Sequence, residues 1–206
     1  MIHLRVSNLN KTFGKQSVIQ NLSFTFQNNV LGIAGANGSG KSTLLKLLTG
    51  LLKPTSGEIT WKISDKLYKA NQVKKELGFS APSIQLYDEL TSAENLKFLQ
   101  SLHQNGKPDR ESIPALLQLF EADHLADKYY GELSTGQQQR IKLASACINN
   151  PSVICLDEPG TNLDTAGIEM LTNFIDQSKR SGKMILLASN QEQELRLCEE
   201  VLNLSN

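Results

Sequence analysis

A glycine-rich stretch, residues 35–42, follows the pattern G-x-x-x-x-G-K-[ST] and leaves few folds open to this chain. The apolar run Val30–Ala34 precedes it and predicts a strand, and residues 41–51 follow with leucines spaced as on one helical face. Further strand-like runs return at residues 152–156 and 184–188, with a helical pattern between them. Strands that alternate with helices are typical of an α/β sheet with mostly parallel strands, and we predict that fold class.

The glycine-rich stretch is suited to hold phosphate. Its glycines allow backbone N–H groups to converge on phosphate oxygens, and the following helix N-terminus adds a favourable field for negative charge. Lys41 would reach the β- and γ-phosphates of a nucleotide, while the Ser42 hydroxyl would ligate Mg²⁺. The alternative is a glycine-rich turn that happens to precede Lys-Ser, but the expected strand–loop–helix context favours the phosphate site. The predicted nucleotide-binding residues are Gly35, Asn37, Gly38, Ser39, Gly40, Lys41, Ser42 and Thr43.

Two carboxylates stand at the end of the strand predicted at residues 152–156. In open α/β sheets, ligands bind at this carboxyl-terminal edge. Asp157 would hold Mg²⁺ through its hydration shell, and Glu158, pointing the other way along the strand, would orient or deprotonate the attacking water. Taken alone, the pair is equally well explained as two solvated charges. Beside the phosphate loop, the catalytic interpretation is favoured.

The segment Leu133-Ser134-Thr135-Gly136-Gln137 resembles the LSGGQ motif that defines the ATP-binding-cassette (ABC) ATPases, with Thr135 in place of the first glycine. Ser134 is placed as a helix N-cap, with Gln137 three residues on. The helix that begins here would present free N–H groups, a hydroxyl and the flexible Gly136 to an anion. In isolation the segment is explained by an ordinary capped helix; together with the other motifs it indicates an anion site.

The resemblance extends over essentially the whole chain. It implies a P-loop NTPase of the α/β class, with a mostly parallel core sheet flanked by helices, an antiparallel N-terminal β portion and a helical subdomain insert. The chain, residues 1–206, would be a single ABC ATPase domain. Residues 1–82 and 149–206 would form its nucleotide-binding core, and residues 83–148 the helical subdomain that carries the LSGGQ-like segment.

The family pattern also implies roles for residues outside these motifs. Phe13 lies where the family carries an aromatic side chain that stacks on adenine, although a core phenylalanine would explain it too. Residues 162–164, Asn-Leu-Asp, match the D-loop, which contacts the opposite subunit. In this family two subunits pair head-to-tail, so each ATP would also meet the partner's Ser134, Thr135, Gly136 and Gln137.

At two positions the chain departs from the family pattern. Pro82 stands where the family usually has a glutamine that senses Mg²⁺ and the membrane partner; Gln85, three residues later, is the alternative metal contact if the loop is displaced. Asn190 occupies the place of the switch histidine. Asparagine can donate a hydrogen bond to the γ-phosphate but cannot carry a charge or a shuttled proton, so we expect slow hydrolysis. The alternative is that Asn190 merely caps the following helix.

Composition excludes some classes of function. Lys+Arg and Asp+Glu both number 21, so there is no electrostatic footprint for nucleic acid or for anionic lipid. No signal peptide and no apolar run of about 20 residues, as a membrane span needs, is found. Cys147, Cys155 and Cys198 have no metal-like spacing and are expected to be reduced packing residues, and the three histidines to lie on the surface.

The function that these features predict is that of an ATP-binding and ATP-hydrolysing subunit of an ABC transporter. ATP-driven closure of a dimer with a second ATP-binding subunit would power a membrane-spanning permease subunit on another chain. The protein would be cytoplasmic and peripheral on the inner face of the cell membrane. The chain looks most like the small haem-exporter ATPases of cytochrome c maturation and is also similar to ATPases of drug or lipid exporters. The alternatives are a soluble ABC ATPase acting on ribosomes or DNA, a regulatory nucleotide binder with little turnover, and a P-loop kinase, which would leave the LSGGQ-like segment unexplained.

Overall fold

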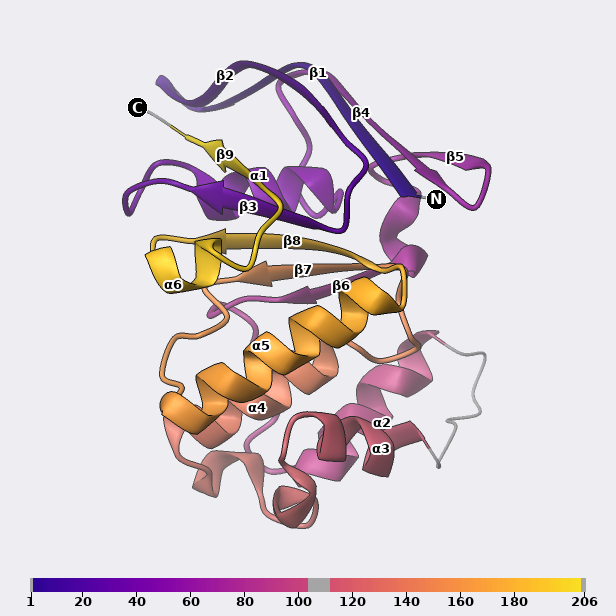
Figure 1. The fold of residues 1–206 in the computed structure, drawn as a ribbon, viewed down its shortest axis with the longest axis vertical. Coiled ribbons are helices and arrows are strands. Elements are labelled where there is room, and N and C mark those ends of the chain that lie inside the picture. The colour runs from indigo at the N-terminus through magenta and orange to yellow at the C-terminus, as the bar shows by residue number, and fades with distance from the viewer. Residues whose placement is uncertain (1, 104–111, 205–206) are drawn as a thin grey trace.

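The computed structural model describes residues 2–103 and 112–204 and shows two sheets with a group of helices beneath them (Figure 1). An antiparallel sheet, the uppermost layer in Figure 1, has the strand order β2-β1-β4-β5. Its strands are β1 Ile2–Phe13, β2 Gln16–Phe26, β4 Ser56–Ile63 and β5 Lys66–Lys69. The second sheet has the order β6-β7-β8-β3-β9, and its neighbouring strands all run parallel. These strands are β3 Val30–Ala34, β6 Leu77–Ser80, β7 Val153–Asp157, β8 Met184–Ser189 and β9 Glu200–Asn203.

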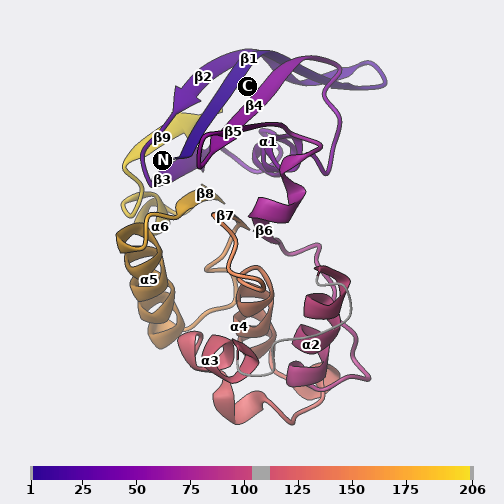
Figure 2. The ribbon, with the colours of Figure 1, turned by 90° about the vertical axis from the view of Figure 1, so that its right-hand side faces the viewer.

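The helices occupy three places in the fold. Helix α1, Lys41–Leu48, lies between the two sheets, and the short helix α6, Glu192–Leu195, follows β8 (Figures 1 and 2). The larger helices lie on the other side of the parallel sheet: α2 Ser92–His103, α3 Ser112–Leu119, α4 Thr135–Ser145 and α5 Thr165–Arg180. Three 3₁₀ turns complete the described elements: η1 Val73–Glu76, η2 Asp123–Leu125 and η3 Tyr130–Glu132.

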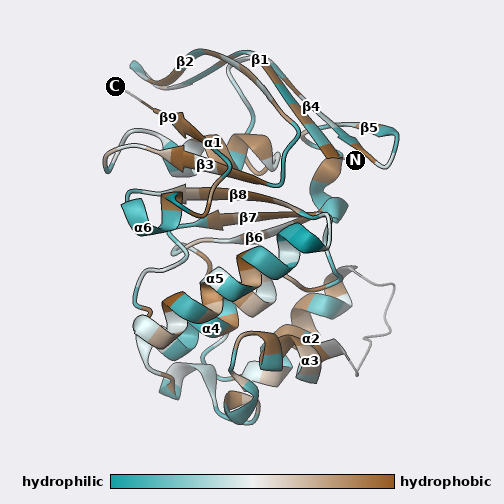
Figure 3. Ribbon diagram, in the orientation of Figure 1, coloured by the Kyte–Doolittle hydropathy of each residue, from teal (hydrophilic) through white to brown (hydrophobic). Residues whose placement is uncertain are grey.

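The central strands β3, β7 and β8 are buried along their whole length, as is usual for a parallel sheet covered on both faces. They are the brown strands in the middle of Figure 3. Successive residues of β7 pack alternately into two cores. Ile154 and Leu156 join the cluster shared with the larger helices, whereas Val153 and Cys155 join the cluster shared with α1 and the antiparallel sheet.

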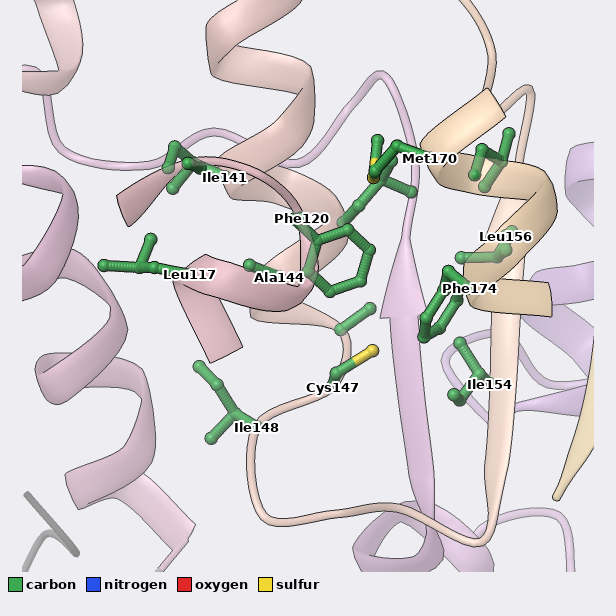
Figure 4. Packing of buried hydrophobic residues seen from close by; sticks show 14 of the residues in the cluster. Leu117, Phe120, Ile141, Ala144, Cys147, Ile148, Ile154, Leu156, Met170 and Phe174 are labelled. Atoms are coloured by element: carbon green, nitrogen blue, oxygen red, sulfur yellow. The ribbon is translucent and has the colours of Figure 1, made fainter. Parts of the chain in front are cut away.

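The core below the parallel sheet holds the helical region against the strands. The rings of Phe120 and Phe174 lie 4.8 Å apart there, with Met170 and Cys147 beside them (Figure 4). Between β6 and β7, two neighbouring strands of one sheet, the described residues form helices, turns and loops, with one isolated β-bridge between Thr91 and Tyr129. This is the region assigned to the helical insert, residues 83–148, of which 104–111 lie outside the described residues. The predicted α/β class and the antiparallel N-terminal portion are confirmed.

The core above the parallel sheet contains Trp61, the only tryptophan of the chain. Its ring is fully buried, and its Nε1–H donates to the carbonyl oxygen of Leu48 at 3.0 Å. Leu48 is the last residue of α1, so this bond ties the far end of that helix to β4 of the antiparallel sheet.

Local contacts explain where α1 ends and where α2 begins. The helix predicted for residues 41–51 ends earlier, at Leu48, and Leu51 is 55% exposed instead of packing on the apolar face. The reason is Gly50, which has φ 68° and lies so close to the Ala70 carbonyl that the chain turns away from the helix there. A capping box precedes α2, because the backbone N–H groups of Thr91 and Glu94 each donate to the other's side chain.

The cysteine and histidine side chains differ in how deeply they are buried. Cys147 and Cys155 are fully packed in the two cores, and burial raises the pKa of the Cys147 thiol to about 12. Cys198 is half-buried. His124 is exposed and His3 is half-buried, so the surface expectation was only partly right for His3, while the side chain of His103 lies outside the described residues.

Candidate functional site

The phosphate loop connects the end of β3 to the start of α1, as the sequence predicted. Gly40 stands at the N-cap with φ 99° and without a side-chain cap, so the first N–H groups of α1 are not bonded by a capping side chain. A side chain at Gly35 would overlap the Ser39 hydroxyl and lie 2.9 Å from the Leu204 carbonyl oxygen. The loop is therefore folded tightly around its own backbone, with N–H groups of α1 facing the space where an anion binds.

Lys41 is the centre of the described contacts. Its side chain is only 6% exposed, and its ammonium donates to the carbonyl oxygens of Gly35 at 2.8 Å and Ala36 at 3.3 Å. The same nitrogen lies 3.4 Å from Oε1 of Glu158, which follows β7. The buried Lys41 ammonium thus connects the phosphate loop to the carboxylate of Glu158 at the end of β7.

Asp157 is the last residue of β7 and is buried. Burial raises the pKa of its carboxyl group; the nearby Ser42 hydroxyl opposes this shift, and the Glu158 carboxylate adds to it. Its Oδ1 has no hydrogen-bond partner among the described residues. A carboxylate oxygen that lacks a partner beside a hydroxyl is a donor set that suits a hard divalent cation. No cluster of three or more His, Cys, Asp or Glu that could hold a metal exists in the described part of the chain. Mg²⁺ fits here only if phosphate and water oxygens complete its coordination.

Glu158 does not extend the strand, contrary to the expectation that it would point the other way along β7. The strand ends at Asp157, and Glu158 adopts a left-handed conformation with φ 49°. Its N–H donates to the Ala188 carbonyl at 2.8 Å, so β8 still holds its backbone. The turn brings its carboxylate to Lys41, an arrangement that strand periodicity cannot indicate.

Asn190 lies at the same edge of the sheet, directly after β8. Its Nδ2 donates to Oδ1 of Asn37 in the phosphate loop at 3.0 Å. The N-cap of the following helix is Gln191, so the structure does not support the alternative that Asn190 caps it. The position assigned to the switch residue therefore lies against the phosphate loop.

Pro82, at the position where the family usually has a glutamine, and Gln85 lie just after β6, at the edge of the helical region. The Pro82 carbonyl accepts a hydrogen bond from Lys142 of α4 at 3.3 Å. Gln85 is exposed, and within the described residues no hydrogen bond joins it to Ser42 or Asp157. Its assignment as a metal contact stays a prediction without a structural contact to support it.

Phe13, at the end of β1, is 47% exposed, so it is not a core residue. The Lys11 ammonium lies 4.7 Å from the centre of its ring. On the first half of β2, a groove of about 470 Å³ includes Val18 and extends to Gly38 and Ser39 of the phosphate loop. An exposed aromatic ring at the turn of the β1–β2 hairpin, together with a groove that runs along the first half of β2 to the phosphate loop, suits a nucleoside phosphate.

The LSGGQ-like segment forms a second surface, at the start of α4. Ser134 is the N-cap of α4 in a complete capping box, since its Oγ accepts from Gln137 N at 3.3 Å and its N–H donates to Gln137 Oε1 at 3.1 Å. Thr135 is exposed, and Gly136 is close enough to the Asn162 carbonyl that a Cβ would lie 2.8 Å from it. Ser134–Gln137 and residues 162–164 together line a groove of about 740 Å³.

Two buried polar side chains that the sequence did not single out contact the turn after Glu158. Gln139 of α4 donates to the Pro159 carbonyl at 2.8 Å, and Glu194 of α6 accepts from the Gly160 N–H at 3.1 Å. A polar residue on a helix is ordinarily taken as solvent-facing, and nothing in the spacing of these two marks them as buried.

Comparison with known proteins agrees with this geometry. A family model described as ABC transporter matches residues 19–161. An uncharacterized ABC transporter ATP-binding protein of Bacillus subtilis is 30% identical over 98% of this chain and 93% of its own length. A cytochrome c biogenesis ATP-binding export protein of Vibrio parahaemolyticus is 34% identical over 92% of both chains.

Among solved structures, an ATP-binding cassette in a dimeric post-hydrolysis state bound to ADP and Pi has a TM-score of 0.86 and 25% identity, over 97% of this chain and 93% of that chain. The resemblance inferred from the motifs, including that to the haem-exporter ATPases, is thus confirmed. The chain belongs to the ABC transporter family, as a subunit that binds and hydrolyses ATP.

Proposed function

We propose that this subunit binds ATP between its own phosphate loop and the LSGGQ-like segment of a second ATP-binding subunit, in a head-to-tail dimer. The observation that carries the proposal is that the chain has two separate grooves, one beside the phosphate loop and one at the LSGGQ-like segment. The groove beside the phosphate loop and the groove at Ser134–Gln137 share no lining residue. The first lies beside the loop that leads into α1, and the second includes the first turn of α4, so two such chains facing each other would enclose each nucleotide from both sides.

In the hydrolysis we propose, Lys41 neutralises the β- and γ-phosphates, and Ser42 and Asp157 hold Mg²⁺ together with phosphate and water oxygens. When bound, Mg²⁺ would supply positive charge that offsets the negative charge developing on the phosphates. Glu158 accepts a proton from a water whose oxygen bonds to the γ-phosphorus, while the bond from that phosphorus to the β–γ bridging oxygen breaks. ADP and phosphate are the products. Asn190 donates a hydrogen bond to the γ-phosphate, and Phe13 stacks on adenine.

We further propose that a membrane-spanning permease on another chain docks in an apolar groove of about 320 Å³. The groove lies between Leu51, which follows α1, residues Leu77 and Phe79 of β6, and the segment just after α4 at Ala146 and Ile148. Helix α4 begins at the LSGGQ-like surface and ends at this groove, so one rigid element connects the second nucleotide surface with the docking place.

No helix in the described ranges, 2–103 and 112–204, is long and apolar enough to cross a bilayer. The proposed permease therefore supplies the membrane contact, and the subunit would lie peripherally on the inner, cytoplasmic face of the cell membrane. The slow-turnover alternative is favoured by one observation, the presence of Asn190 beside the phosphate loop. The ribosome and DNA alternatives have no comparable support, because the formal net charge of the chain is zero.

The assignment of Lys41 can be tested by ATP titration. Lys41→Ala removes an ammonium that would bond both terminal phosphates, and charge-assisted bonds of this kind contribute about 1.5–3 kcal/mol each. We expect ATP affinity to fall roughly 100-fold or more. Lys62→Ala is the matched control, because that lysine pairs only with Asp65 at the surface of β4. Unchanged affinity of Lys41→Ala would refute the phosphate-loop assignment.

The head-to-tail dimer can be tested with Glu158→Gln. Because the water is no longer activated but the phosphates still bridge two chains, we expect this variant to retain ATP and to sediment as a dimer. Thr135→Arg in the same background should bind ATP yet stay monomeric, since it places bulk and charge at the exposed start of α4 without altering the capping box. An ATP-saturated Glu158→Gln monomer would count against the sandwich.

The role of Asn190 can be tested by steady-state kinetics. Losing a donor to the transferring phosphoryl group typically costs 10²–10³-fold, about 3–4 kcal/mol, and asparagine keeps part of that interaction. Asn190→His should therefore raise kcat with little change in KM, whereas Asn190→Ala should lower kcat further. Gln191→Ala, at the adjacent exposed residue, should change neither. Equal rates for all three residues at position 190, with Glu158→Gln inactive, would show that Asn190 is not a switch.

The docking groove can be tested by recovery of the permease from solubilised membranes. Leu51→Glu places a carboxylate in the apolar groove, where its desolvation is unfavourable. We expect the recovered amount of the membrane subunit to fall roughly tenfold or more, with ATP affinity unchanged. Leu67→Glu is the control, because that leucine is also exposed but lies on β5. If Leu51→Glu recovers the membrane subunit as well as Leu67→Glu does, the permease docks elsewhere.

A further inference from the structure

The peptide unit that joins Pro159 to Gly160 is held at both of its polar atoms. Its carbonyl oxygen accepts a hydrogen bond from Nε2 of Gln139 at 2.8 Å, and its N–H donates to Oε1 of Glu194 at 3.1 Å. Both side chains are buried, Gln139 being 6% exposed and Glu194 1% exposed. Because the two atoms lie on opposite sides of one planar unit, the two bonds together prevent that plane from rotating.

This peptide unit lies one residue after Glu158, on the far side of Pro159, and the backbone conformation of Glu158 needs support. A left-handed conformation is unfavourable at a residue other than glycine and persists only where the surroundings enforce it. The turn is closed by the Thr161 N–H, which donates to the Glu158 carbonyl at 3.2 Å. The Pro159 ring fixes the φ angle between this peptide unit and the one before it, so holding the Pro159–Gly160 plane also restrains the turn at Glu158. If that plane rotated, Glu158 would be free to return to an extended conformation and its carboxylate would leave Lys41.

The packing around Gly160 shows that the arrangement leaves little room for variation. A Cβ on this residue would overlap Oε1 of Glu194 and lie 2.8 Å from Cδ1 of Ile168. Only a glycine allows the carboxylate to approach the backbone N–H at this point. The buried carboxylate of Glu194 therefore fits against Gly160 because that residue has no side chain.

We propose that Gln139 and Glu194 are positioning residues, which fix the carboxylate of Glu158 for hydrolysis by clamping the Pro159–Gly160 peptide. The inference rests on the proposed role of Glu158 as the residue that activates water. Gln139 comes from α4, the helix that starts at the LSGGQ-like surface, and Glu194 comes from α6, directly after Asn190. The clamp therefore connects three motifs at one backbone unit.

The chemistry of Glu194 indicates which substitutions at this position test the clamp. Burial raises the pKa of its carboxyl group, and the Ser189 hydroxyl and the Gly160 N–H oppose that shift. Its Oε2 has no hydrogen-bond partner within the described residues. What the clamp requires is one acceptor oxygen at Oε1, which the amide of glutamine also supplies, and not the negative charge.

The test measures single-turnover phosphate release and ATP affinity for Glu194→Ala, Glu194→Gln, Gln139→Ala and the double alanine variant. Glu194→Ala should lower the hydrolysis rate roughly 10- to 100-fold, with ATP affinity changed less than about twofold, because the lost bond acts on Glu158 and not on the nucleotide. Glu194→Gln should stay within about threefold of the unmodified protein. The double variant should lose less than the product of the single losses, since both bonds hold the same peptide. Glu192→Ala, on the same helix but exposed, should hydrolyse ATP normally.

Three results would overturn the proposal: a normal rate in both single alanine variants, a fall in ATP affinity that matches the fall in rate, or a Glu194→Gln variant as slow as Glu194→Ala. If Glu194→Ala does not fold, as thermal melting would show, Glu194→Gln and Gln139→Ala decide the matter by the same criteria. Glu158→Gln is measured alongside. Hydrolysis by Glu158→Gln would refute the role of Glu158 itself, whereas an inactive Glu158→Gln with fast Gln139→Ala and Glu194→Ala refutes only the clamp.

Discussion

The parallel pairing of β7, β8 and β3 brings the catalytic segments together. In this ladder Asp157 pairs with Ala188, and Ser189 pairs with Ala34. The three strands therefore end at one level, and the residues that follow them, the Glu158 turn, Asn190 and the phosphate loop, emerge side by side. Because the strands are buried on both faces, a slip in register would move every apolar side chain out of its core. The same packing that stabilises the sheet thus determines where the site is.

Lys41 and α4 extend that arrangement beyond the sheet. Lys41 connects the loop after β3 with the acid after β7, although these strands are not neighbours and β8 lies between them. Helix α4 carries the LSGGQ-like surface at its start, the Gln139 contact with the Glu158 turn in its middle, and the apolar groove at its end. A structural change at any one of these three places therefore acts on the same helix.

Much of the fold and of the candidate site could be predicted from sequence, wherever one residue type satisfies one local requirement. The bounds of β3 agreed to the residue, and the capping box of Ser134 and Gln137 formed as the spacing indicated. The end of α1 could not be predicted, because it depends on how close Gly50 comes to Ala70, a residue from another part of the chain. The same holds for the left-handed Glu158 and for buried Glu194. In each of these cases the deciding neighbour is distant in sequence, so periodicity and spacing carry no signal of it.

The burial of Trp61 has a consequence for how this molecule can be observed. As the chain's only tryptophan, it is the sole indole emitter, and it lies in a dry core with its ring nitrogen bonded to the last residue of α1. That helix begins at Lys41, so a shift of α1 on nucleotide binding would change the polarity around the ring and the wavelength of its emission. The protein therefore contains an intrinsic optical reporter at the opposite end of the helix whose start is proposed to hold the phosphates.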